Sequence, residues 1–143
     1  IMKRYGALAG EWHSQLSLNE RRKVFKNVVS GHLKLLIGAR SALFLPFKKL
    51  GLIIVDEEHD QSYKQDEGVI YNARDMAISR ASFENIPVNL ITAVPSVETF
   101  QNIKKKKYKL SKLKNRYQKA YLPNYKIIDL NNDKKETTSW ICI

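Results

Sequence analysis

The chain of 143 residues is 43% hydrophobic and 27% charged, with a formal net charge of +11. This composition is typical of a folded globular domain, and no run reaches the roughly 18–20 apolar residues that a membrane-spanning helix needs. The sequence shows no apolar secretory leader, and its single cysteine, Cys142, excludes an internal disulfide and a cysteine-rich zinc module. We therefore expect a cytoplasmic protein without a membrane partner.

The first third of the sequence predicts a strand, a helix and a second strand. A weakly patterned strand is expected within residues 6–12. Ser17 and Glu20 have the spacing of a capping box ahead of apolar residues at helical spacing, and Gly31 provides a helix stop. The apolar run Leu35–Gly38 is too short for a helix and predicts a strand.

The middle of the sequence alternates strands with helices. The apolar run Gly51–Val55 predicts a buried strand, Asn72 opens a helix to about Glu84, Val88–Thr92 predicts a strand, and Pro95 and Ser96 open a helix to about Ile103. Continuously apolar strands are typical of a parallel sheet with helices on both faces. The alternation predicts an α/β fold with crossover connections.

Most of the net charge lies in the last quarter. Residues 1–103 carry 13 basic and 11 acidic side chains, whereas residues 104–143 carry 12 basic and 3 acidic ones. Two further strands are predicted here, at Tyr108–Leu113 and Tyr125–Leu130. The basic excess suits a polyanion such as nucleic acid, and equally a solvated lysine-rich surface, and composition leaves both interpretations open.

The strongest local signal is the acidic cluster after the strand at residues 51–55. Ligands of open α/β sheets bind beyond the carboxyl ends of the strands, so Asp56 and Glu57 are expected to face a ligand crevice. A strand followed by two carboxylates matches a Walker B arrangement, in which the aspartate holds Mg²⁺ through water and the glutamate orients an attacking water. The alternative is a solvated turn, and the motif alone leaves both open.

An ordered series of motifs resembles the PriA family of replication-restart helicases, which are superfamily-two helicases of the DEAH type. The series comprises Gly38–Phe44, Leu43–Gly51, Asp56–His59, Ser62–Gly68 and Tyr71–Asp75, within a resemblance from about His13 to Leu130. It implies a partial RecA-like fold: a parallel sheet of the P-loop NTPase type with flanking helices, lacking its first strand and phosphate loop. Residues 1–130 would be part of the first motor lobe (motifs Ia to III). Residues 131–143 would be a polar tail, either disordered or a non-native ending.

The resemblance also implies roles for individual residues. Asp56 and Glu57 would act at the nucleotide as a catalytic pair, with Asp56 holding Mg²⁺ through water, and His59 would couple nucleotide state to DNA. The implied DNA contacts are His13, Ser14, Arg40, Ser41, Tyr63, Lys64, Tyr71 and Arg74, and the coupling residues of motif III are Thr92, Pro95 and Ser96. Tyr63 and Tyr71 either stack on unpaired bases or pack against the lobe, and Arg40 either contacts phosphate or forms a surface salt bridge.

The sequence departs from the family at several positions. It contains no glycine-rich phosphate loop ending in Gly-Lys-Ser/Thr, and Ala39 and Val94 replace the usual threonines of motifs Ib and III. The second motor lobe and the zinc module of the family are also not recognised. The family uses ATP and Mg²⁺ for 3′-5′ unwinding of forked or single-stranded DNA with other primosome proteins. We expect this chain alone to bind neither ATP nor Mg²⁺.

Four interpretations of function remain open. The chain is a fragment of a PriA-like helicase acting in replication restart and primosome assembly, a non-catalytic DNA-binding module, one half of a split helicase that needs its missing segments from a separately encoded partner, or a gene remnant. A sheet without its first strand would expose an apolar edge. We therefore expect marginal stability, aggregation or dependence on a partner.

Overall fold

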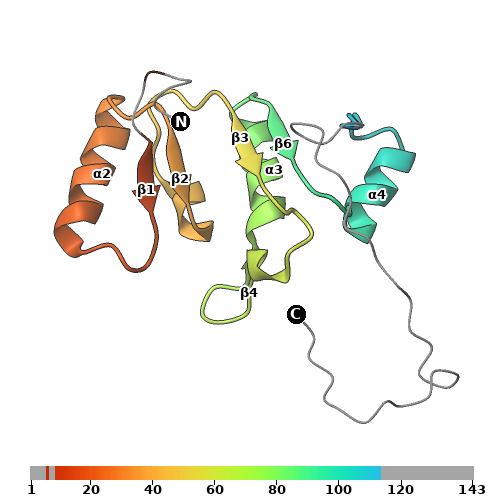
Figure 1. The fold of residues 1–143 in the computed structure, drawn as a ribbon, viewed down its shortest axis with the longest axis horizontal. Helices are drawn as coiled ribbons and strands as arrows, with labels where there is room; N and C mark the ends of the chain where they lie inside the picture. The colour runs from red at the N-terminus through yellow and green to blue at the C-terminus, as the bar shows by residue number, and fades with distance from the viewer. Residues whose placement is uncertain (1–5, 7–8, 114–143) are drawn as a thin grey trace, which may run out of the picture. The chain divides into compact units, whose positions relative to one another are not determined.

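A computed structural model describes residue 6 and residues 9–113, so the strand expected at Tyr125–Leu130 and the tail at 131–143 lie outside the described residues. The helices and strands are β1 (Gly10–Trp12), α2 (Leu18–Ser30), β2 (Leu36–Gly38), β3 (Ile53–Val55), β4 (Lys64–Gln65), β5 (Tyr71–Asn72), α3 (Ala73–Phe83), β6 (Val88–Leu90) and α4 (Val97–Lys104) (Figure 1). Two 3₁₀ turns, η1 (Arg40–Phe44) and η2 (Gln61–Tyr63), lie between them. All of these elements belong to a compact unit that ends at Tyr108.

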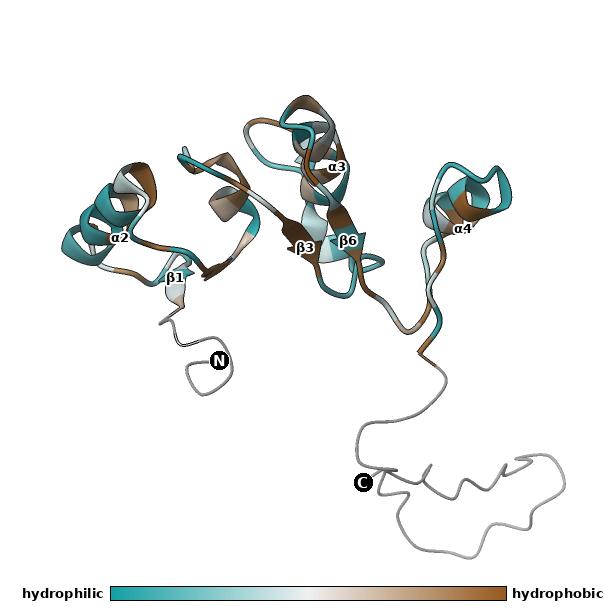
Figure 2. Ribbon diagram, turned by 90° about the horizontal axis from the view of Figure 1, so that it is seen from above, coloured by the Kyte–Doolittle hydropathy of each residue, from teal (hydrophilic) through white to brown (hydrophobic). Residues whose placement is uncertain are grey.

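Helix α2 begins and ends where the sequence predicts. The Ser17 hydroxyl accepts a hydrogen bond from the Glu20 N–H, and the Glu20 carboxylate accepts one from the Ser17 N–H at 2.8 Å, which completes the capping box. Gly31 ends the helix at φ 78°, a left-handed conformation that glycine adopts without a Cβ clash. The helix buries Val28, contacts β1, and is largely hydrophilic elsewhere (Figure 2).

The predicted parallel pairing is confirmed, but in separate pairs. β1 pairs with β2 and β3 pairs with β6, both in parallel, while β4 and β5 form an antiparallel hairpin. The described residues thus contain three two-stranded sheets, where the sequence predicted one continuous sheet. Helix α3 contacts both β3 and β6 (Figure 1) and buries three small side chains, Ala73, Ala77 and Ala81.

Only one face of β3 is covered by a helix within the described residues. Val55 is buried, whereas Ile54 is 56% exposed, and Ile37 on β2 is 53% exposed. Successive strand residues point to opposite faces, so α3 covers the Val55 side and leaves the Ile54 side uncovered. The sequence predicted helices on both faces of the sheet. In the described residues α3 covers one face of the β3–β6 pair, and the apolar face that carries Ile54 is exposed.

The prediction of a strand at Tyr108–Leu113 is wrong. These residues form neither helix nor strand, and Leu110 and Leu113 are exposed. A strand persists where its backbone groups are paired and one face is buried, and no described segment supplies either here. The hairpin β4–β5 was missed, because two-residue strands are too short to show a period of two.

None of the helices in the described part of the chain has the length and apolar character that crossing a membrane requires.

Removing the α2 cap tests the local origin of this helix. Ser17→Ala should lower the free energy of unfolding by about 1 kcal/mol, because the Glu20 N–H loses its acceptor. Urea unfolding followed by circular dichroism measures the change. The matched control is Ser82→Ala, an exposed α3 serine whose hydroxyl makes no hydrogen bond among the described residues, and it should change stability by less than about 0.5 kcal/mol. Equal effects of the two substitutions would contradict the capping role.

Candidate functional site

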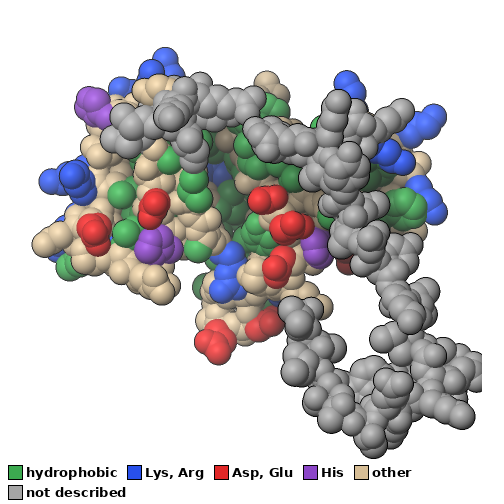
Figure 3. Space-filling model, in the orientation of Figure 1, with side chains coloured by type: hydrophobic (Ala, Val, Ile, Leu, Met, Phe, Trp, Pro, Cys, Tyr) green, Lys and Arg blue, Asp and Glu red, His purple; other side chains and the backbone are tan. Residues whose placement is uncertain are grey.

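A tight turn at the carboxyl end of β3 presents two carboxylates to solvent. Asp56 and Glu57 are exposed, and Glu57 has φ 48°, a left-handed conformation uncommon for residues other than glycine. The Glu57 N–H donates to Asp56 Oδ1 at 3.1 Å, and the Asp60 N–H donates to the Glu57 carbonyl at 2.8 Å. Acidic side chains gather beside a histidine on this face (Figure 3). Both carboxylates therefore lie where the ligands of α/β sheets bind.

The turn offers carboxylate oxygens to a hydrated cation but does not enclose one within the described residues. Within the described residues, Asp56 Oδ2 accepts no protein hydrogen bond, so it is available to a water of a hydrated ion. No group of three or more metal-ligating side chains occurs in the part of the chain that the structure describes. Mg²⁺ in nucleotide sites takes one or two carboxylates together with waters and phosphate oxygens. Asp56 fits that donor set.

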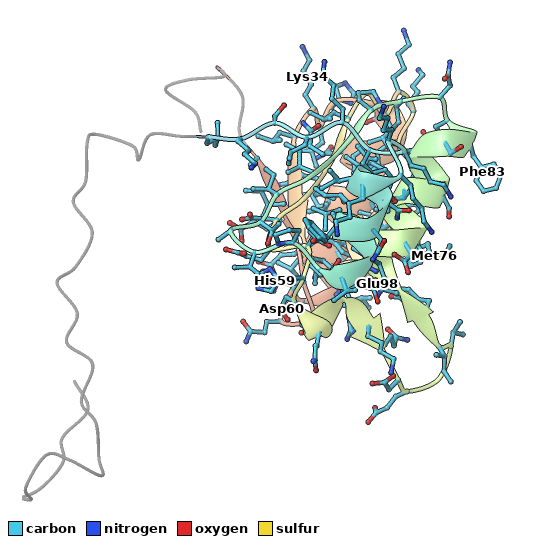
Figure 4. All side chains as sticks on the ribbon, turned by 90° about the vertical axis from the view of Figure 1, so that its right-hand side faces the viewer. Lys34, His59, Asp60, Met76, Phe83 and Glu98 are labelled. Atoms are coloured by element: carbon cyan, nitrogen blue, oxygen red, sulfur yellow. The ribbon has the colours of Figure 1, made fainter. Side chains whose placement is uncertain are left out.

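His59 and Thr92 meet across the ends of neighbouring strands. His59 Nδ1 lies 2.7 Å from Thr92 Oγ1, which donates to the Val94 carbonyl at 2.8 Å. Since that hydroxyl proton is already used, Thr92 accepts from His59, and the neutral ring carries its proton on Nδ1. The same Nδ1 lies 3.6 Å from the Glu57 carboxylate. Pro95 of the same segment is exposed, and His59 lies beside Asp60 at one end of the fold (Figure 4).

The third residue of the turn, Glu58, points inward and is only 1% exposed. Its carboxylate accepts hydrogen bonds from the Ser96 N–H at 2.7 Å, the Ser96 hydroxyl at 2.9 Å, the Thr99 hydroxyl at 2.9 Å and Arg74 Nη1 at 3.3 Å. Burial raises the pKa of Glu58, but the donors on Ser96, Thr99 and Arg74 outweigh it, so that the pKa lies below its ordinary value of 4.5. Glu58 is therefore ionised inside the fold at neutral pH.

Arg74 lies in the first turn of α3 and is 8% exposed. Its Nε donates to Asp75 at 2.9 Å and its Nη1 to the Ser96 hydroxyl at 2.9 Å, besides Glu58. Burial lowers the pKa of Arg74, and its contacts with Asp75 and Glu58 raise it by more. The guanidinium, expected at a DNA surface, faces the interior instead, so a direct phosphate contact would require this cluster to open.

The DNA contacts predicted in motifs Ia and Ib lie at one edge of the β1–β2 pair. The register sets Trp12 opposite Gly38, so the residues that follow the two strands, His13–Ser14 and Arg40–Ser41, leave the sheet side by side. The Trp12 indole donates to Ser41 Oγ at 3.1 Å. Gly38 is required here, because a Cβ would lie 2.4 Å from Ala42 Cβ. The structure thus brings the two predicted motifs together.

Arg40 connects this edge to the hairpin β4–β5. Its Nη1 donates to the Lys64 carbonyl at 2.7 Å, and the Lys64 ammonium lies 3.0 Å from the Asp66 carboxylate. Lys64 is exposed and Arg40 half-buried. Arg40 makes none of the side-chain salt bridges found among the described residues, and its remaining N–H donors are available for a phosphate.

The two predicted aromatic residues are anchored in the fold. The Tyr63 hydroxyl donates to the Asp56 carbonyl at 2.5 Å, and the Tyr71 ring packs edge-on against Phe44 with centroids 5.3 Å apart. Burial raises the pKa of Tyr63, and the nearby negative charges raise it further. Both tyrosines are half-buried. This geometry favours the packed alternative over an open stacking platform.

Four residues that support the site were not singled out from the sequence: Trp12, Arg21, Glu58 and Thr99. Arg21 donates to the Ser14 carbonyl at 2.8 Å and the His13 carbonyl at 3.3 Å, so it holds the segment after β1. Thr99 had a usable signal, since it stands three residues after the capping Ser96. The contacts of Trp12 and Glu58 join segments at least 16 residues apart, and those of Arg21 reach back seven and eight residues, so none of them has the spacing of a local cap.

Comparison with known proteins finds several relatives that share one name. No family model matches the sequence. The chain is 46% identical to replication restart protein PriA of Rickettsia conorii over 141 residues, which are 99% of this chain and 22% of that protein. It is 48% identical to the Helicobacter pylori protein of that name over 108 residues, which are 76% of this chain and 17% of that protein. It is 38% identical to the Bacillus subtilis protein of that name over 130 residues, which are 91% of this chain and 16% of that protein. The chain spans about a fifth of the length of the curated relatives it matches.

The buried ion pair can be tested through stability and its pH dependence. Glu58→Gln should lower the free energy of unfolding by about 3 kcal/mol at pH 7, because Arg74 loses its buried charge partner. Folding lowers the pKa of Glu58, so its ionised form stabilises the fold above about pH 4.5, and this stability is lost as the pH falls through the lowered folded value. Urea unfolding between pH 3 and pH 7 should show that the free energies of unfolding of the Glu58→Gln variant and the unsubstituted chain converge as the pH falls.

Glu98→Gln is the matched control. This carboxylate also faces Arg74, at 3.9 Å, but its side chain is 69% exposed, so its loss should cost less than about 1 kcal/mol. A difference between Glu58→Gln and the unsubstituted chain that stays constant from pH 7 to pH 3 would contradict an ionised Glu58.

Proposed function

Because this chain is homologous to one segment of replication restart protein PriA, we propose that it supplies the part of an ATP-driven DNA helicase motor that runs from motif Ia to motif III. The resemblance recognised in the sequence is confirmed by relatives at 38–48% identity. In this proposal the chain takes part in replication restart, with forked or single-stranded DNA and other primosome proteins as partners.

The observation that carries the proposal is the arrangement at the ends of β3 and β6. Two exposed carboxylates, Asp56 and Glu57, stand beside a histidine that is hydrogen-bonded to Thr92. A nucleotide hydrolase needs a cation ligand, a group that orients water, and a contact that reports on its state. These residues supply all three within one turn and the adjacent strand end.

Each residue has a distinct part in the proposed chemistry. Bound Mg²⁺–ATP would supply the phosphoryl group that is transferred to water. Asp56 would hold a water of the hydrated cation through Oδ2, and Glu57 would orient the attacking water and accept its proton. His59, with its proton on Nδ1 toward Thr92, keeps Nε2 as an acceptor directed away from that contact. A displacement of the Thr92 side chain would therefore be transmitted to the proposed hydrolytic turn through the single hydrogen bond to His59.

The proposed DNA surface is formed by the residues that follow β1 and β2 and by the hairpin. It comprises His13, Ser14, Arg40, Ser41 and Lys64, with Tyr63 and Tyr71 as supports. Arg40 is the central member, because a guanidinium can donate two hydrogen bonds to phosphate at once. We leave Arg74 out of the contact set because of its burial.

A second candidate function is DNA binding without hydrolysis. It is favoured by the sequence itself, since none of the 143 residues forms a Gly-Lys-Ser/Thr phosphate loop, while both candidate DNA motifs are present. A separately encoded partner carrying such a loop would restore the first candidate function.

Hydrolysis by the isolated chain separates the candidates. We expect phosphate release from ATP, with or without single-stranded DNA, to stay at the level of Glu57→Gln, because the 143 residues contain no glycine-rich phosphate loop of the Gly-Lys-Ser/Thr type. A coupled phosphate assay at saturating Mg²⁺ measures it. DNA-stimulated turnover that Glu57→Gln abolishes would show that the chain hydrolyses ATP by itself.

DNA binding should be weak and depend on salt. Fluorescence anisotropy with a labelled single strand should give a linear fall of log K with log salt concentration, with a slope of about −0.7 for each phosphate neutralised. Arg40→Gln should reduce the magnitude of the slope by about 0.7. Lys26→Gln, an exposed cation on α2, is the control and should leave the slope unchanged. Equal effects of both variants, or binding insensitive to salt, would remove Arg40 from the surface.

A further inference from the structure

We propose that Glu58 is a positioning residue that links the hairpin β4–β5, through Arg74, to the segment that opens α4 and to the conformation of Glu57. Its part in coupling DNA to hydrolysis rests on the proposed function, but the mechanical link does not. The argument starts from the donors around a single buried carboxylate.

Three separate segments meet at Glu58. Its Oε1 accepts from the Ser96 N–H, and its Oε2 accepts from the hydroxyls of Ser96 and Thr99 and from Arg74 Nη1. Ser96 is the N-cap of α4, and Arg74 also donates to its hydroxyl. The turn after β3, the start of α3 and the start of α4 therefore share one set of hydrogen bonds.

Arg74 is tied to the hairpin by the residue that caps α3. Asn72 is the last residue of β5, where it pairs with Lys64 of β4, and its side chain accepts from the Arg74 N–H at 3.0 Å. A displacement of β5 thus moves the backbone that carries Arg74. The partner strand β4 holds Arg40 through the Lys64 carbonyl, so a displacement of the proposed DNA surface reaches Arg74 in three steps: from Arg40 to Lys64, from Lys64 to Asn72, and from Asn72 to Arg74.

Glu58 also restrains its neighbour Glu57. The Glu58 N–H donates to the Ile91 carbonyl at 3.1 Å, so the backbone and the side chain of Glu58 are both held. Glu57 stands next to it at φ 48°, a strained conformation for a residue with a Cβ, which persists only where the surroundings impose it. Loss of the Glu58 contacts would allow the turn to relax and would redirect the Glu57 carboxylate.

Stability alone does not account for a charge at this position. A buried ion pair adds little over well-packed apolar residues of similar volume. Four directional donors, by contrast, restrict the three segments to one relative arrangement. That restriction is what a positioning residue provides.

The test is hydrogen exchange with a perturbation placed in the hairpin. Asn72→Ala removes the α3 cap and should raise the exchange rates of the Ser96 and Thr99 amides by about fivefold, the factor for loss of a typical N-cap. In the Glu58→Gln background the same substitution should add no further increase, because the link is already broken. Ser17→Ala, which removes the cap of α2, should leave these amides unchanged in both backgrounds.

Two results would overturn the link. One is that Asn72→Ala leaves the exchange rates of the Ser96 and Thr99 amides unchanged. The other is that Asn72→Ala raises these rates equally with Glu58 and with Gln at position 58, as a merely structural role for Glu58 would give. If Glu58→Gln does not fold, Thr99→Val serves instead, since it removes one donor at nearly constant volume and should reduce the transmitted increase. The readout needs neither DNA nor nucleotide, so a failure of DNA binding would count against the proposed function and not against this link.

Discussion

The carboxylate of Glu58 is buried almost completely, and a charge in that position must find its hydrogen-bond donors inside the protein. An unpaired buried carboxylate would cost several kcal/mol, which is a large part of the stability of a small domain. The donors come from Arg74, Ser96 and Thr99, so the starts of α3 and α4 are held against the turn after β3. The positions of the exposed carboxylates Asp56 and Glu57 follow from where this turn is held.

One acidic turn therefore combines two opposite environments. Asp56 and Glu57 point to solvent and are accessible to a ligand, whereas Glu58 is buried and its charge is stabilised by hydrogen-bond donors inside the fold. Since the Glu58 charge is balanced by Arg74, it adds little to the repulsion between the outer pair. The outer carboxylates remain suited to a cation, and the inner one determines their geometry.

Arginine side chains contribute hydrogen bonds between segments next to the two parallel strand pairs. Arg80 of α3 donates to the Leu43 and Leu45 carbonyls at the end of η1, and Arg40 donates to the Lys64 carbonyl of the hairpin. Hydrogen bonds from long side chains to backbone carbonyls tolerate adjustment better than a continuous strand ladder does. These hydrogen bonds connect the proposed DNA surface to the proposed hydrolytic turn by way of η1 and β4.

The sequence by itself determined the helices, the parallel pairing and the family. The starts of α2, α3 and α4 depend on local caps at Ser17, Asn72 and Ser96, which interact with residues two or three positions ahead and can be read from spacing. The resemblance carried by Asp56–His59 and its flanking motifs is supported by relatives along the chain. These signals are local, so they survive without knowledge of the fold.

Only the tertiary structure decided which side chains face inward. In a run of adjacent carboxylates nothing in the sequence distinguishes Glu58 from Glu57, and the donors that make Glu58 the buried one lie 16, 38 and 41 residues further along the chain. The interior position of Arg74, the exposed face of β3 and the absence of a strand at residues 108–113 have the same origin. The burial of a side chain, and the persistence of a strand, depend on what distant segments bring into contact, and that information is not local.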